Sequence, residues 1–141
     1  MKKFLFVALA ASMLFSFAGC KKKAVDPKDI TAELAKIIDS DDCAKAAKDL
    51  DAFVAANGEA WKTYLITKGK EAVKGKAADS VDVDAIVADI LTGGDKALAD
   101  KLENGKCAND AAVKKITDEK FASIMQAVGE AIGNELKGDA K

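Results

Sequence analysis

The chain has 141 residues, of which 22 are basic and 23 are acidic, so its formal net charge is only −1. It contains no histidine, and every basic residue is a lysine. These absences exclude an imidazole base, an imidazole metal ligand and the bidentate clamp that arginine makes on phosphate. Lysines and acids alternate along the chain instead of forming one basic face, which argues against nucleic-acid binding. We therefore expect a protein that is not an enzyme, with no catalytic residues, metal or cofactor.

The first residues of the chain have the organisation of an export signal. Two lysines follow the initiating methionine, and residues 4–17 carry no charge. This apolar run is shorter than the roughly 20 residues that span a bilayer, and it ends in two small residues before Cys20. We expect residues 1–19 to be a signal peptide that is removed on export.

The end of this signal, Phe17-Ala18-Gly19-Cys20, resembles the lipobox of bacterial lipoproteins. In that family the cysteine thiol takes a diacylglycerol group, a peptidase cuts just before the cysteine, and the new amino group often takes a further acyl chain such as palmitate. The resemblance implies that Cys20 carries the lipid. Two or three acyl chains hold a protein on a bilayer almost permanently.

The resemblance also predicts a location and a domain organisation. Lys21 stands where an aspartate retains enterobacterial lipoproteins at the inner membrane, which implies the outer membrane of the cell envelope. Residues 20–26 would be the lipidated cysteine and a lysine tether, and residues 27–141 a single helical domain. No later stretch of the sequence is apolar and long enough to span a membrane, so the lipid alone would anchor the protein.

Apolar residues then recur at helical spacing and predict three helices in the first half of the domain. The first begins at Asp26-Pro27, since aspartate is a good N-cap and proline fits the first helical position. The second is capped by Ser40 and ends at Asn57-Gly58, a pair typical of a left-handed helix stop. The third covers residues 59–74.

Two groups of residues in the predicted domain have alternative interpretations. Trp61 and Tyr64 could form a ligand platform or contact a membrane, but an aromatic pair at helical spacing more often belongs to the core. Asp79, Asp82 and Asp84 resemble the start of a calcium loop. They lack the glycine and the glutamate that an EF-hand needs, so helix caps explain them better.

A fourth helix begins near Val83 and stops at Gly93-Gly94, and a fifth runs from an Asp95 cap to Asn104-Gly105. The last and longest segment begins at Asn109 or Asp110.

Within that last segment, Thr117-Asp118-Glu119 looks like a second helix start. Gly129 and Gly133 form a GxxxG pattern, which we interpret as a close crossing with a neighbouring helix, inside the domain or between copies of the chain.

The sequence thus contains six short segments with apolar residues at helical spacing, joined by short connections. This pattern predicts an all-α fold, a small antiparallel bundle of about five to six short helices. With Cys20 assigned to lipid by the resemblance, Cys43 and Cys107 remain as a pair, and export would place them in an oxidising compartment. A disulfide between them would close a loop of about 65 residues and add about 4 kcal/mol of stability. Two buried free thiols and a metal or redox pair are the alternatives.

These features predict a lipid-anchored envelope protein with a structural, interaction or surface-antigen role, whose partner is another protein or a second copy of the chain. One alternative is a helical module on the periplasmic side that binds a small apolar ligand. Another is attachment to peptidoglycan through Lys141, since the murein lipoprotein of enteric bacteria has a similar terminal lysine. The strict heptads of that coiled coil are absent here.

Overall fold

The computed structural model describes residues 25–138, and this part of the chain consists of helices and their connections, with no strand. The predicted all-α bundle is therefore confirmed for these residues. The predicted signal peptide, the predicted lipidation site Cys20 and the terminal Lys141 lie outside them. None of the helices in the described part is both long and apolar enough to cross a membrane.

Six α-helices, two 3-10 helices and one π-helical turn follow one another within residues 25–138. In chain order they are η1 (Pro27–Asp29), α2 (Ile30–Ile38), α3 (Cys43–Val73), η2 (Ala78–Ser80), α4 (Val83–Thr92), α5 (Lys96–Asn104), α6 (Ala111–Ile116), the π turn η3 (Thr117–Phe121) and α7 (Ala122–Gly138).

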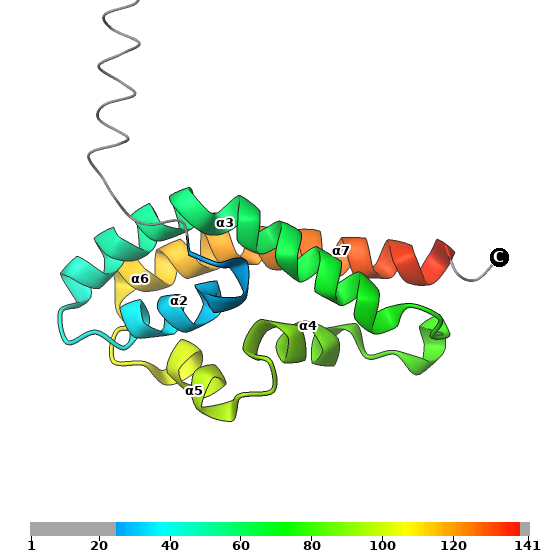
Figure 1. The fold of residues 1–141 in the computed structure, drawn as a ribbon. Coiled ribbons are helices and arrows are strands. Elements are labelled where there is room, and N and C mark those ends of the chain that lie inside the picture. The colour runs from blue at the N-terminus through cyan, green and yellow to red at the C-terminus, as the bar shows by residue number, and fades with distance from the viewer. Residues whose placement is uncertain (1–24, 139–141) are drawn as a thin grey trace, which may run out of the picture.

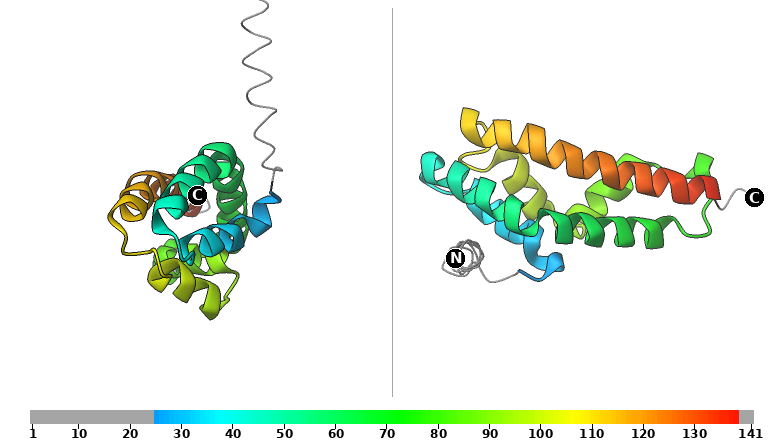
Figure 2. Two further views of the ribbon diagram at one scale, coloured as in Figure 1. Left: turned by 90° about the vertical axis from the view of Figure 1, so that its left-hand side faces the viewer. Right: turned by 90° about the horizontal axis from the view of Figure 1, so that it is seen from above.

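The helices form two layers. α6, η3 and α7 make one continuous rod that lies beside α3, and α2, α4 and α5 cover one side of this pair (Figures 1 and 2). The rod and α3 run in the same direction, because Gly58 faces Ile124 and Gly69 faces Ile132. Consecutive helices such as α2 and α3 reverse direction, as the short connections predicted. The chain returns through α4 and α5 before it begins the rod, which allows the two longest segments to lie parallel.

α3 is a single helix of 31 residues, so the predicted stop at Asn57-Gly58 is wrong. Both residues are buried inside the helix. The side-chain amide of Asn57 donates to the carbonyl of Phe53 at 3.1 Å. A Cβ at Gly58 would lie 3.6 Å from Ile124, an ordinary van der Waals contact, so Gly58 faces α7 from within the helix and does not end it.

Aspartates cap five of these helical segments. Asp42, and not Ser40 as predicted, is the N-cap of α3: its carboxylate accepts from the Lys45 N–H at 3.0 Å, whereas the Ser40 hydroxyl accepts from Asp42 N–H. Asp42 directly precedes Cys43, the first residue of the helix, whereas Ser40 lies two residues too early. The caps of η1, α4 and α5 are as predicted: Asp26, Asp82 and Asp95. Of the two candidates for the start of α6, Asn109 and Asp110, Asp110 is the cap.

The second start expected at Thr117-Asp118-Glu119 is absent, because the rod continues through this segment as the π turn η3. Of the two uses expected for Gly129 and Gly133, a close helix crossing inside the domain is absent. A Cβ at either would meet no other described atom within 4 Å, so no helix crosses closely there inside the domain. The close crossing of α7 with α3 uses Gly69 of α3 instead.

The core lies between α2, α3 and the rod. Its largest fully buried side chains are Trp61, Ile30, Leu34, Ile38, Leu50, Leu65, Ile132, Val73, Val113, Val128 and Cys107. α4 and α5 contribute none of them, and their apolar residues are only half-buried. The α4–α5 layer thus covers the core without being part of it.

Candidate functional site

The structure joins the two predicted cysteines. Cys43, the first residue of α3, and Cys107, in the connection before α6, form a disulfide with their Cα atoms 5.2 Å apart. This separation lies within the ordinary range for disulfides. The predicted pairing is confirmed, so in this structure the two cysteines are neither free thiols nor metal ligands.

Several contacts fix the segment around this disulfide. The Cys107 N–H donates to the carbonyl of Ile38 at 2.9 Å. The ammonium group of Lys106 pairs with the Asp41 carboxylate. This hydrogen bond and the charge of Lys106 hold the pKa of Asp41 below its ordinary value, and the same partner raises the pKa of Lys106. The disulfide therefore ties together the α2–α3 connection and the α5–α6 connection at one end of the bundle.

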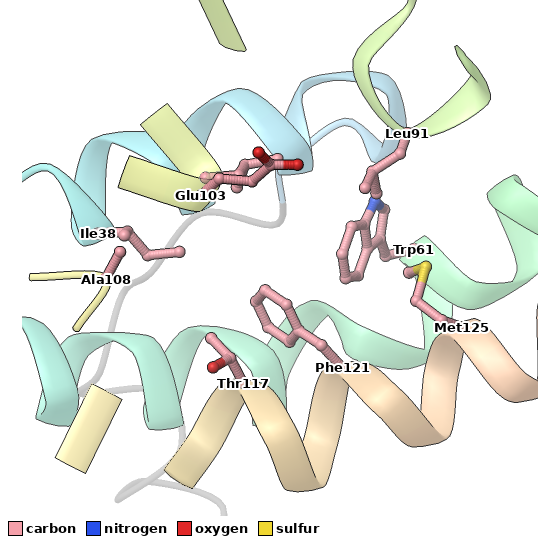
Figure 3. Close-up of a pocket in the computed structure, with 9 residues that line it drawn as sticks. Ile38, Trp61, Leu91, Glu103, Ala108, Thr117, Phe121 and Met125 are labelled. Carbon is pink, nitrogen blue, oxygen red and sulfur yellow. The ribbon is translucent and has the colours of Figure 1, made fainter. Parts of the chain in front are cut away.

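A cavity of about 170 Å³ lies where the α4–α5 layer meets the core. Its walls come from five helices, from η3 and from the loop after α5. The lining residues are Ile38, Trp61, Leu91, Leu102, Glu103, Ala108, Thr117, Phe121 and Met125. Figure 3 shows the side chains of Trp61 and Phe121 on one side of this space and those of Ile38 and Ala108 on another.

Trp61 belongs both to the core and to the cavity wall. It is 2% exposed, and its indole N–H donates to the hydroxyl of Thr31 at 3.2 Å. Its ring meets that of Phe121 edge to face, with centroids 5.4 Å apart. The core interpretation of Trp61 is confirmed, while Tyr64 is only half-buried and lines a shallow groove beside Pro27.

Two polar side chains reach the cavity. The Thr117 hydroxyl donates to the carbonyl of Lys114 at 2.8 Å, which leaves its oxygen able to accept a further hydrogen bond. Glu103 is exposed at the edge of the cavity, and its carboxylate makes no ion pair with another residue of the described part. The lining is otherwise apolar, which suits a molecule with an apolar body and one polar end.

Of the three aspartates near the start of α4, the structure shows a helix cap only at Asp82. Asp82 caps the helix by accepting from the Ala85 N–H at 3.1 Å. Within residues 25–138, no three or more histidine, cysteine or acidic side chains are placed to hold a metal ion.

The cavity was not located by the sequence. The apolar residues of α4 and α5 have the same spacing as those of core helices. Hydrophobic spacing shows which face of a helix is covered, but not how completely its side chains are buried. The chain matches no protein-family model, and comparison with curated proteins and with solved structures found no match either.

Proposed function

We propose that this protein is a lipoprotein of the bacterial envelope, anchored in the outer membrane through lipid on Cys20. Its helical domain acts there in a structural or interaction role, through binding surfaces and without a catalytic centre.

The Cys43–Cys107 disulfide carries this proposal. Because these two cysteines are bonded to each other, Cys20 is the one of the three that is left for a lipid. It directly follows the export-like segment and lies in the lipobox-like motif. Disulfides persist in secreted and periplasmic proteins and are rare in the reducing cytosol, so the bonded pair supports export.

The length of the tether supports a position close to the bilayer. The described domain begins at Val25, five residues after Cys20. Five residues span at most about 18 Å when fully extended. A domain held by lipid on Cys20 would therefore work at the membrane surface, within reach of other envelope components.

The intact mass of the protein from the membrane fraction of its host tests the anchor. We expect a chain that begins at Cys20 and carries the added mass of diacylglycerol and an acyl group. Cys43 and Cys107 should resist alkylation until the protein is reduced. The matched control is Cys20→Ser, which removes the lipid and leaves the disulfide intact. An unlipidated wild-type chain in the soluble fraction would contradict the proposal.

Expression in an enteric bacterium tests the choice of membrane. After separation of the two membranes by density, the wild-type protein should be found with the outer membrane. Lys21→Asp should shift it to the inner membrane, because this residue follows Cys20, where aspartate acts as a retention signal in lipoproteins of that group. A wild-type protein that stays at the inner membrane would contradict the outer-membrane location alone.

A further inference from the structure

We propose that the cavity under α4 and α5 binds a small molecule that has an aromatic ring or a short alkyl chain and a neutral or positively charged end. This site is independent of the lipid anchor, since its lining residues all lie within the described domain.

The size of the cavity sets the size of the ligand. Its volume is about 170 Å³. An apolar protein cavity of about 150 Å³ takes up benzene, so this one suits a single ring with a small substituent and excludes a long acyl chain.

The walls match such a ring. Trp61 and Phe121 present aromatic surface, and Met125 adds a flexible thioether that contacts aromatic rings favourably. Figure 3 shows these three side chains around one side of the space. The indole N–H of Trp61 is already used by Thr31, so the tryptophan offers the ligand its ring.

The charge of the lining residues determines which charge the polar group of the ligand can carry. Glu103 is the only charged residue among those that line the cavity. No lysine lines it, although the chain has 22 basic residues. Glu103 would repel a carboxylate ligand, and no lining cation could pair with it. An amine could instead pair with Glu103, and a hydroxyl could donate a hydrogen bond to it. Fatty acids are therefore the wrong class of ligand, for their charge as well as for their length.

The π turn provides independent support for a site. η3 is flanked by regular α-helix on both sides, and its first and last residues, Thr117 and Phe121, both line the cavity. π turns inside α-helices are rare and frequently occur at functional sites, where the extra residue changes the direction of the side chains.

The α4–α5 layer allows a ligand to enter. Neither helix has a fully buried residue, and they meet at the exposed turn Gly93-Gly94. Moving this layer away from the core exposes less apolar surface than moving α2, whose Ile30, Leu34 and Ile38 are at most 1% exposed.

Three ligands with one ring but different charges test the proposal: benzylamine, benzyl alcohol and benzoate. Trp61 is the only tryptophan of the chain and lines the cavity, so its fluorescence reports binding directly. The purified mature protein is used, in phosphatidylcholine vesicles if it is lipidated and in buffer if it is not. We expect saturable changes with benzylamine and benzyl alcohol, and benzylamine to bind about fivefold more tightly than benzoate, the factor for an exposed ion pair of about 1 kcal/mol.

Two variants tie these signals to the cavity. Glu103→Gln should abolish the preference for benzylamine over benzoate. Benzyl alcohol should still bind, because the side-chain amide oxygen of glutamine also accepts a hydrogen bond. Glu130→Gln, the same change at an exposed position of α7 away from the cavity, should keep the preference. Ala108→Leu should fill the space and weaken all three ligands, with helicity by circular dichroism showing that the fold is kept.

Three results would overturn the proposal. No saturable signal with any ligand would mean that the cavity is not a binding site. Tighter binding of benzoate than of benzylamine would overturn the charge assignment. A preference that survives Glu103→Gln would overturn the role of this carboxylate. None of these results bears on the lipid at Cys20, which the intact mass tests separately.

Discussion

Ile132 of α7 lies directly over Gly69 of α3, so closely that a Cβ at position 69 would come within 2.5 Å of the Ile132 side chain. The Ile132 side chain is fully buried at this point, and the same glycine also faces Ile90 of α4. One residue without a side chain thus lets three helices meet, and it sets the distance between the two longest segments of the bundle.

Gly69→Ala should lower the free energy of unfolding by about 1–3 kcal/mol, because the new methyl group would overlap Cγ1 and Cδ1 of the fully buried Ile132. The matched control is Gly129→Ala in α7, where a Cβ meets nothing within 4 Å. There the better helix propensity of alanine should add up to about 1 kcal/mol. Urea unfolding followed by circular dichroism measures both. Equal effects of the two substitutions would contradict the close crossing.

Thr31→Val should destabilise the protein by about 1–3 kcal/mol, because it keeps the shape of the side chain but leaves the buried indole N–H of Trp61 without its acceptor. Thr67→Val is the control, since the Thr67 hydroxyl is exposed and bonds only to the carbonyl of Thr63 in its own helix. Unfolding in urea compares the two. If Thr67→Val lowered the free energy of unfolding as much as Thr31→Val, the effect at Thr31 would not come from its hydrogen bond with Trp61.

The helices themselves could be predicted because aspartate caps and apolar stripes are local signals. Asp26, Asp82, Asp95 and Asp110 each mark a helix start that the structure confirms. Counting cysteines likewise paired Cys43 with Cys107 without any knowledge of the packing, once Cys20 was set aside for the lipid.

The role of glycine could not be read in the same way. Asn57-Gly58 has the composition of a helix stop, yet Val54, Gly58, Trp61, Leu65, Gly69 and Val73 continue one buried stripe through it. The sign that the helix continues is that the buried residues before and after Asn57-Gly58 lie on the same face of one helix. The parallel packing of α3 against the rod, and with it the cavity, depends on contacts between residues far apart in sequence, which spacing along one segment does not contain.

Reducing the Cys43–Cys107 disulfide should lower the stability of the domain by about 2–5 kcal/mol, as expected for a native disulfide that closes a long loop in a small domain. Thermal unfolding with and without a reductant measures the effect. The double variant Cys43→Ser/Cys107→Ser should start at the lower melting temperature and not respond to the reductant. A wild-type protein whose melting temperature is unchanged by complete reduction would contradict a stabilising role.

Lys106 and Asp41 should make the end of the bundle that carries the disulfide sensitive to acid. The hydrogen bond and charge of Lys106 hold the pKa of Asp41 below its ordinary value of 3.8. The contribution of this carboxylate to stability is therefore present above that value and is lost as the pH falls through the lowered pKa of the folded state. For Lys106 the direction is opposite: its pKa is raised above 10.5, so its contribution is present below that value and lost as the pH rises beyond it.

An NMR titration of the Asp41 carboxyl group checks this assignment. In the wild type its midpoint should lie below that of an ordinary aspartate, and in Lys106→Met it should move up towards 3.8 because the donor and the charge are both removed. Lys68→Met is the control, since Lys68 pairs with Glu71 on α3 and should leave the Asp41 midpoint unchanged. Because both side chains of the Asp41–Lys106 pair are exposed, added salt should also raise the wild-type midpoint. A midpoint that depends on neither salt nor Lys106 would mean that the pair does not form in solution.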